Sequence, residues 1–323
     1  MAVAVILLAL LLGLAAPYPP GPVVREIRWH WDTLRSAAPG SDLWPVAEGP
    51  DGNLYTAWGD GGGFGGSDQE GRVSMGFARI EGGPENFRGI NINGGRNALN
   101  PASFPKKGKT SGLVFVGGTL YASVNQQDGP WPDVTHVLVW SADLGATWSK
   151  AGWVFPRGAG RFQPETFLSF DGFVYLYGHR IFDSNHLYLA RVPAAKIRDR
   201  AAYEFFDEPV FTDPNGAWAA TVVYHPGLKR FLLTTFHTGP GQLGVFDGPT
   251  PRGPWTTVAY YDDWGGMGRE GEGLLCSFPT KWMSADGLTL WSVFSVYGAG
   301  AKQGINAHDR FNLIKATLTL KAP

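Results

Sequence analysis

The sequence predicts an all-β protein folded as a five-bladed β-propeller. Its 323 residues include 45 glycines, 24 prolines and 13 tryptophans, and only 17% are charged. Such a composition is typical of many short strands joined by tight turns. No amphipathic helical period runs far enough to compete, and residues 194–203 form at most a short helix or turn. One hairpin pattern recurs five times, and repeats of this size favour blades arranged radially.

Each repeat has an apolar strand, a glycine-containing turn and an aromatic or β-branched strand. The repeats cover residues 45–59, 112–125, 166–178, 219–236 and 280–297, with turn glycines Gly52, Gly117, Gly172, Gly227 and Gly287. A further strand is expected after each, at residues 73–80, 136–140, 187–192, 243–247 and 311–320. Residues 27–33 are expected to close the ring. A six-bladed, sialidase-like propeller is the alternative, with residues 255–261 opening the extra blade.

The N-terminal segment predicts export. Residues 2–16 are uninterrupted apolar, which is short for a membrane span and suits the core of a signal peptide, although no Lys or Arg precedes it. We therefore expect a signal peptide over residues 1–16, a linker over 17–26 and a single propeller domain over 27–323. The mature protein would be secreted or periplasmic, without a membrane anchor.

Composition also narrows the partners. The net charge of −1 indicates no nucleic-acid partner. The single Cys276 excludes an internal disulfide and is expected to be a small buried residue. The sequence has no phosphate-binding loop, no closely spaced His/Cys metal set and no Gly-x-Ser-x-Gly elbow. We expect a monomer with no cofactor and no catalytic metal, and leave a structural calcium ion open.

Candidate site residues follow from the stretch 41–66, which has a hairpin signature followed by a glycine-rich loop. Asp42 precedes the first strand of the hairpin and Asp60 follows the second, so both carboxylates should lie at one end. If the first strand of each blade is innermost, Glu165 reaches the same face from the third repeat. We predict these three acids to be catalytic. The expected substrate-binding residues, at matching strand ends, are Asn125, Gln126, His179, Arg180, Trp218, His237, Lys281 and Tyr297.

Residues Ser141 to Trp148, SADLGATW, fit the Asp-box pattern S-x-D-x-G-x-T-W of sialidase-type propellers. In that pattern the Asp side chain bonds the turn backbone and the Trp packs between strands. The expected role is structural.

Several segments resemble one family. LWPVAEGPDGNLYTAWGDGGGF, LYLARVPAAKIRDRAAYEFF, VVYHPGLKRFLLTTFH, LGVFDGPTPRGPWTTVAYYDDW and FPTKWMSADGLTLWSVFS resemble the domain of unknown function 4185 over residues 40–320. That family is similar to five-bladed propeller glycosidases and includes glycoside hydrolase family 183, endo-D-arabinanases acting on mycobacterial cell-wall arabinan. The resemblance implies paired acids in the first blade, matched here by Asp42 and Asp60. Glu165 rests on the propeller argument alone.

The leading interpretation is a secreted carbohydrate-active enzyme, a glycoside hydrolase that acts on an oligo- or polysaccharide through paired carboxylates. One alternative is a polysaccharide lyase, in which His179 or Tyr297 abstracts a proton beside a uronate carboxylate that Arg180 neutralises. Another is a non-catalytic glycan-binding propeller.

Overall fold

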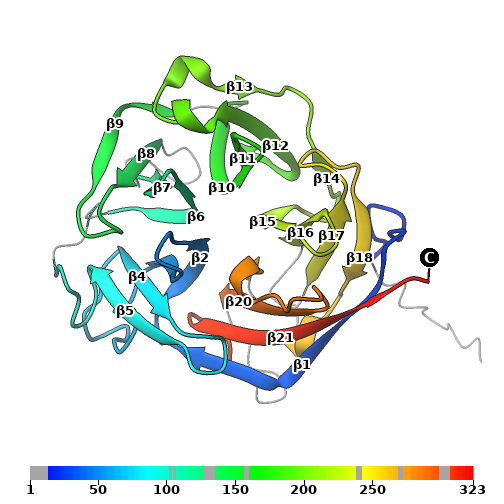
Figure 1. The fold of residues 1–323 in the computed structure, drawn as a ribbon, viewed down its shortest axis with the longest axis horizontal. Coiled ribbons are helices and arrows are strands. Elements are labelled where there is room, and N and C mark those ends of the chain that lie inside the picture. Colours follow the sequence, from blue (N-terminus) through cyan, green and yellow to red (C-terminus); the bar gives the residue numbers. More distant parts are fainter. Residues whose placement is uncertain are drawn as a thin grey trace, which may run out of the picture.

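The structure is a computed structural model that describes residues 14–101, 104, 107–126, 135–155, 160–237, 242–267, 272–297 and 306–322. Over these ranges the strands form five antiparallel sheets set radially around a central axis (Figure 1). The predicted five-bladed propeller is confirmed. The six-bladed alternative is wrong, because residues 256–260 form the outer strand of the fourth blade. Among the described residues, no helix is long and apolar enough to cross a membrane.

Blades 1 to 3 follow the chain from the axis outward. Blade 1 contains β2 (Asp42–Glu48), β3 (Leu54–Gly59), β4 (Met75–Glu81) and β5 (Arg88–Asn93). Blade 2 contains β6 (Lys109–Val116), β7 (Thr119–Asn125), β8 (His136–Ser141) and β9 (Ser149–Phe155). Blade 3 contains β10 (Phe162–Phe170), β11 (Phe173–Arg180), β12 (Asp183–Pro193) and β13 (Glu204–Phe205), and β14 (Phe211–Thr212) also pairs with β12. The short 3-10 helices η1 (Ala194–Lys196) and η2 (Arg200–Ala202) lie where only a short helix or turn was predicted.

Blade 4 contains β15 (Trp218–His225), β16 (Arg230–Phe236), β17 (Leu243–Gly248) and β18 (Thr256–Tyr260). Blade 5 runs from β19 (Glu272–Ser277) through β20 (Thr289–Tyr297) and β21 (Phe311–Leu320) to β1 (Val24–Ala37). The 3-10 helix η3 (Trp264–Gly266) precedes β19, and η4 (Thr280–Trp282) lies between β19 and β20. The first strand of each blade contacts the first strand of the next, and β19 contacts β2, so these strands form the innermost ring.

The fifth hairpin differs from its prediction. Its second strand and its turn glycine, Gly287, are placed correctly, but its first strand is residues 272–277 rather than a strand starting at residue 280. Residues 280–282 instead form η4, because the connection between the two strands is longer than a tight turn. The inner strand of this blade therefore lies before the repeat that the pattern marks.

Both ends of the described chain build blade 5, as predicted for the closing strand. β1 pairs antiparallel with β21, from Val24 opposite Leu320 to Ala37 opposite Phe311 (Figure 1). The predicted linker over 17–26 is wrong, since β1 begins inside it and the Tyr18 ring packs 5.1 Å from that of Phe211. Residues 1–13 of the expected signal peptide lie outside the described residues.

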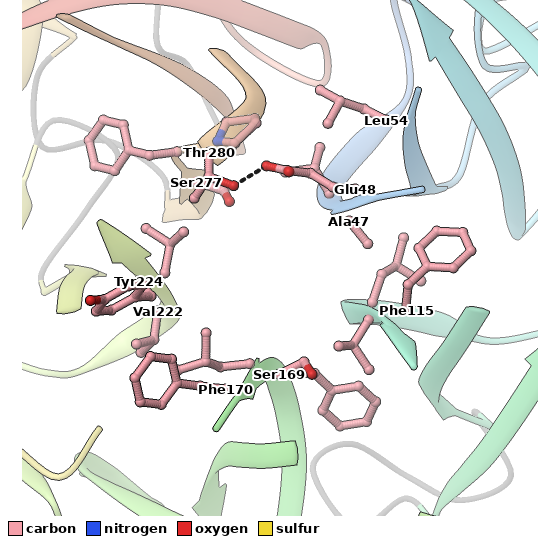
Figure 2. A pocket seen from close by; sticks show the side chains of 18 of the residues that line it. Ala47, Glu48, Leu54, Phe115, Ser169, Phe170, Val222, Tyr224, Ser277 and Thr280 are labelled. Carbon is pink, nitrogen blue, oxygen red and sulfur yellow. Dashed lines mark hydrogen bonds between the residues drawn. The ribbon is translucent and has the colours of Figure 1, made fainter. Parts of the chain in front are cut away.

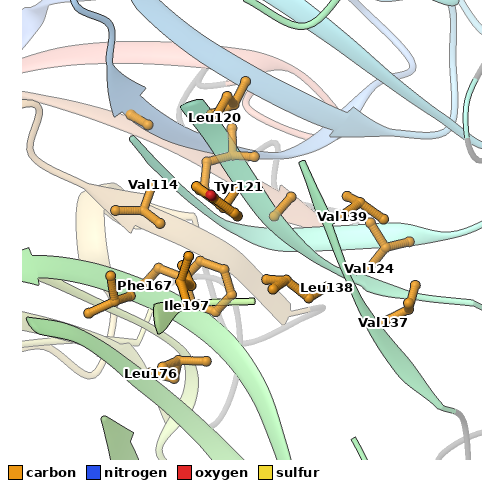
Figure 3. Close-up of a cluster of buried hydrophobic side chains, with 14 of the residues drawn as sticks. Val114, Leu120, Tyr121, Val124, Val137, Leu138, Val139, Phe167, Leu176 and Ile197 are labelled. Atoms are coloured by element: carbon orange, nitrogen blue, oxygen red, sulfur yellow. The ribbon is translucent and has the colours of Figure 1, made fainter. Parts of the chain in front are cut away.

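Apolar side chains between neighbouring sheets hold the blades together. Figure 3 shows part of the cluster in which Val114, Leu120 and Val139 of blade 2 pack near Phe167 and Leu176 of blade 3. Each of these side chains is buried. Because the sheets are fixed against one another over both faces, the strand ends around the axis are held in place.

Candidate active site

A β-bulge interrupts the innermost strand of every blade close to its first residue. At each bulge the pairing register shifts. The shifts lie between Leu43 and Val46 in β2, between Lys109 and Gly112 in β6, between Pro164 and Thr166 in β10, between Trp218 and Thr221 in β15, and between Gly273 and Leu275 in β19. Bulges occur beside active sites because the extra residue redirects a side chain. At each of these five register shifts at least one residue lines a common cavity at one end of the axis.

The cavity has a volume of about 200 Å³. The lining residues at these register shifts are Leu43, Thr110, Ser111, Glu165, Ala219 and Leu274. Its remaining described lining residues lie mostly at strand ends: Asp42, Lys109, Ser123, Asn125, His136, Gln163 and Trp218. This combination of a narrow concavity with convergent polar groups and an aromatic side chain is typical of a ligand site.

Hydroxyl groups fix the bulges from blade to blade. The Ser111 hydroxyl of blade 2 donates to the backbone carbonyl of Glu165 in blade 3 at 3.3 Å. The Thr166 hydroxyl of blade 3 donates to the carbonyl of Ala220 in blade 4 at 2.6 Å. The Thr221 hydroxyl of blade 4 donates to the carbonyl of Cys276 in blade 5 at 2.6 Å. The positions of the cavity-lining residues thus depend on hydrogen bonds between neighbouring blades. Cys276 itself is buried, as expected.

Asp42 is the first residue of β2 and lies opposite Gly59 in β3. Its Oδ1 atom is buried and has no hydrogen-bond partner among the described residues. A Cβ on Gly59 would lie 2.3 Å from this atom, so only glycine leaves room for the carboxyl group. Burial raises the pKa of Asp42 to about 7, although the charge of Lys109 opposes the increase, while Asp309 and Asp60 add to it. Asp42 is therefore protonated in mildly acidic solution.

Glu165 is the extra residue of the β10 bulge, and its side chain is 23% exposed. One carboxylate oxygen lies 3.1 Å from Nδ1 of His179. Burial alone would raise the pKa of Glu165, but the charge and hydrogen bond of His179, with a smaller contribution from His136, bring that pKa below its ordinary value. Asp42 and Glu165 thus share one cavity while their surroundings shift their pKa values in opposite directions.

Asp60 lies at the same end of the hairpin as Asp42, as predicted, but is not among the residues that line the cavity. Its Oδ1 atom is 2.8 Å from Nζ of Lys109 and 3.4 Å from a guanidinium nitrogen of Arg72, and its side chain is 41% exposed. Asp60 therefore acts on Asp42 through its charge, across the lysine that lies beside both.

Three of the eight predicted substrate-binding residues lie at or beside the cavity. Asn125 and Trp218 line the cavity, and His179 lies directly behind Glu165. The other predicted residues at this end of the strands are occupied elsewhere. Gln126 bonds Thr135 at 2.9 Å, and His237 stacks on Tyr260 with ring centres 4.0 Å apart. Arg180 lies 4.1 Å above the Tyr188 ring and pairs with Asp207. Tyr297 is 54% exposed and lies beside His308.

The prediction for Lys281 is wrong. It belongs to η4, at the opposite end of the axis, where its backbone N–H donates to the carboxylate of Glu48, the last residue of β2. That end holds a separate cavity of about 340 Å³, around which Val222, Phe170 and Phe115 come from three inner strands (Figure 2). The error comes directly from the misplaced inner strand of blade 5.

The sequence interpretation missed several lining residues. Thr110 and Ser111 belong to bulges, whose extra residues leave no periodic signal in the sequence. His136 could have been found, since it begins the third strand of blade 2 where β7 ends at this face. Its Nδ1 atom lies 3.2 Å from the hydroxyl of Ser123.

Within the described ranges, no group of three or more His, Cys, Asp or Glu side chains is arranged to hold a metal ion.

The family model for the domain of unknown function DUF4185 matches residues 111–274, just over half of the chain. The chain belongs to this family. No curated relative matches in sequence.

Solved structures resemble this member of the DUF4185 family in fold. The RS223 β-xylosidase is 11% identical with a TM-score of 0.56, over 88% of this chain and 94% of that one. The catalytic domain of the family 62 α-L-arabinofuranosidase of Coprinopsis cinerea is 13% identical with a TM-score of 0.51, over 92% and 98%. A family 43 glycoside hydrolase is 11% identical with a TM-score of 0.53, over 90% of this chain and 51% of that one. These likenesses support the propeller fold, which glycoside hydrolases also use.

Proposed function

We propose that this protein is a glycoside hydrolase that cleaves a polysaccharide, with Asp42 as the proton donor and Glu165 as the ionised partner. The observation that carries the proposal is the pair of carboxyl groups in one cavity, whose surroundings raise the pKa of Asp42 and lower that of Glu165. Glycoside cleavage needs both states at once, one on each side of the scissile bond. The glycoside hydrolases that share the propeller fold are consistent with this chemistry.

In the proposed reaction, Asp42 gives its proton to the glycosidic oxygen as the bond from that oxygen to the anomeric carbon breaks. Glu165 supplies electrons to the anomeric carbon in one of two ways. It attacks the carbon directly, and water later releases the glycosyl group, or it removes a proton from the water that attacks. The anomeric configuration of the first product, followed by NMR, separates the two, because direct attack gives retention and water attack gives inversion.

The rest of the cavity wall suits a sugar. The indole of Trp218 offers an apolar face for a sugar ring, and Asn125 and Gln163 carry both hydrogen-bond donors and acceptors for its hydroxyl groups. Asp60 contributes by its charge, which raises the pKa of Asp42 and so keeps the proton in place near neutral pH.

The lyase alternative receives less support from the same geometry. A lyase base must have a free basic atom facing the substrate, whereas both ring nitrogens of His179 contact protein acceptors, the carboxylate of Glu165 and the carbonyl of Ala217. The side chain of Arg180, which would neutralise a uronate, contacts Asp207 and Tyr188 instead.

The test is a polysaccharide panel that includes arabinans, with reducing-end assays and mass spectrometry of the products. We expect chain cleavage by the wild type and losses of a hundredfold or more in Asp42→Asn and Glu165→Gln, as for a lost general acid or base. Asp60→Asn should retain turnover but move the alkaline limb of kcat/KM to lower pH, since one negative charge beside Asp42 is removed. If Asp60→Asn is inactive while Glu165→Gln turns over normally, Asp60 is the ionised partner.

Two other outcomes would contradict the hydrolase proposal. Products that absorb ultraviolet light near 235 nm would indicate a lyase, because unsaturated uronates absorb at about that wavelength. Retention of glycan fragments without turnover would indicate a binding propeller.

We also propose that the protein is exported, on the basis of the apolar run over residues 2–16. Mass spectrometry of secreted material is expected to show a new N-terminus near Ala15 or Ala16. An intact Met1 on secreted protein would contradict it.

A further inference from the structure

His179 lies behind Glu165 and both of its ring nitrogens meet protein oxygens. Nδ1 is 3.1 Å from the Glu165 carboxylate, and Nε2 is 3.0 Å from the backbone carbonyl of Ala217 in the segment that leads into blade 4. The His179 side chain is only 8% exposed. This histidine therefore joins the acid of blade 3 to the backbone of the next blade.

We propose that His179 is a positioning residue that carries a proton on both ring nitrogens and thereby keeps Glu165 ionised and directed at the substrate. The inference rests on the proposed function of Glu165 and assigns the group that sets its protonation state. The hydrolase proposal itself does not require this role.

The first step of the argument concerns Nε2. A backbone carbonyl can only accept a hydrogen bond, so Nε2 must carry a proton to bond Ala217. The carbonyl is held in place, because the backbone N–H of Ala217 donates to Ser184 of blade 3 at 2.8 Å. The centre of the Trp218 ring lies 6.0 Å from that of the imidazole, at a tilt of 38°.

The second step concerns Nδ1. With Nε2 protonated, the contact to Glu165 contains one more proton, on either the carboxyl oxygen or Nδ1. An imidazole is ordinarily about two pKa units more basic than a glutamate, so the proton belongs on Nδ1. The result is an imidazolium next to a carboxylate, a charge-assisted hydrogen bond in a site shielded from water.

The charged groups around the pair agree with this assignment. Burial lowers the pKa of His179, but the charge and hydrogen bond of Glu165, the Ala217 carbonyl and Asp183 of β12 raise it above its ordinary value overall. On the other side, His136 of β8 lowers the pKa of Glu165 further. The negative charges near the imidazole and the positive charge near the carboxylate both favour the ion pair.

The consequence is a fixed division of roles. The side chain of Glu165 is directed by its bulge and by a cation that is itself bonded to a neighbouring blade, so Glu165 is not suited to donate a proton. The proton needed by the leaving group must come from Asp42. Without His179, Glu165 would keep only the smaller influence of His136, and burial would favour its protonated form.

The test is NMR on the full protein, which needs no substrate. In wild type labelled with ¹⁵N-histidine, His179 is expected to show both nitrogens protonated at pH 5 and at pH 6, and to lose the Nδ1 proton only above the ordinary pKa of histidine. In ¹³C-labelled His179→Gln, the Glu165 carboxyl is expected to titrate at a pKa higher by about one unit or more. The acidic limb of kcat/KM should move by the same amount. His186→Gln is the matched control, since His186 bonds Asp183 at 2.6 Å and does not contact Glu165.

A neutral His179 at pH 6, or an unchanged Glu165 titration in folded His179→Gln, would overturn the proposal. If His179→Gln does not fold, the wild-type ¹⁵N measurement decides alone. An inactive protein with the expected titrations would contradict the hydrolase proposal and leave the role of His179 in place.

Discussion

Replacing Asp42 with Asn should remove activity and, at alkaline pH, stabilise the fold. The folded protein resists ionisation of Asp42, so its pKa of about 7 exceeds the ordinary 3.8. The stabilising contribution of the neutral carboxyl is complete below pH 3.8 and is lost as the pH rises through about 7. At about 1.4 kcal/mol per pKa unit, the full loss is about 4 kcal/mol, and solvent reaching the cavity reduces it to about 2–4 kcal/mol.

The measurement is urea unfolding of wild type and Asp42→Asn at pH 4 and pH 8. The amide cannot ionise, so the free energy of unfolding of the variant minus that of wild type should increase by about 2–4 kcal/mol between the two pH values. Asp171→Asn is the matched control, because Asp171 is exposed in the β10–β11 turn and its φ of 48° is one that Asn adopts readily. An equal difference at both pH values would show that Asp42 is not held protonated, and the acid assignment would fail with it.

Three further predictions test separate parts of the structure. Gly59→Ala should push the Asp42 carboxyl out of place and lower turnover by about tenfold to a hundredfold. Gly152→Ala is the control, because the space around its Cβ position is open and turnover should not change. Equal activities of the two variants would refute the steric argument. Asp143→Ala should lower the free energy of unfolding by about 1–2 kcal/mol, because the Asp143 carboxylate accepts hydrogen bonds from the Thr147 N–H at 2.8 Å and hydroxyl at 2.6 Å. Turnover per folded molecule should stay the same, and a large loss there would place this turn at the site. The imidazole of His225 accepts a hydrogen bond from one backbone N–H and donates one to a backbone carbonyl. Burial lowers the pKa of His225. Its contribution to stability is therefore complete above the ordinary pKa of 6.5 and is lost as the pH falls. The stability difference between wild type and His225→Gln should therefore shrink from pH 7 to pH 5, and urea titrations that find it constant would contradict this.

The sequence was sufficient for the ring and for much of the cavity wall, because hydrophobic periodicity and turn glycines determine where strands start and stop. Asp42, Asn125 and Trp218 stand at such strand ends, and each was predicted to face the site that the cavity now defines. Glu165 was predicted as a strand start, although it is the extra residue of a bulge.

What the sequence could not supply is local irregularity and side-chain partnership. A bulge shifts the alternation of a strand by one residue, but β6 has consecutive buried residues and little alternation in which the shift could be seen, so Ser111 gave no signal. His179 and Arg180 are neighbours at one strand end, yet one bonds Glu165 and the other packs on Tyr188. Alternate residues of a strand point to opposite sides, and which side meets the cavity depends on the register of the neighbouring blade.

The closing strand of blade 5 has a consequence for how the chain acquires its fold. β1 is made before the strands of blades 1 to 4, but its partner β21 is made after them, and Val24 pairs with Leu320. At roughly 5–20 residues per second, the ribosome needs about 15–60 seconds to make the residues between them. During that time β1 is an extended segment with unpaired backbone groups, the kind of edge at which chains associate wrongly. Blades 1 to 4 can form in order behind it, but the ring around the axis closes only when blade 5 supplies β19 between β15 and β2 and pairs β21 with β1.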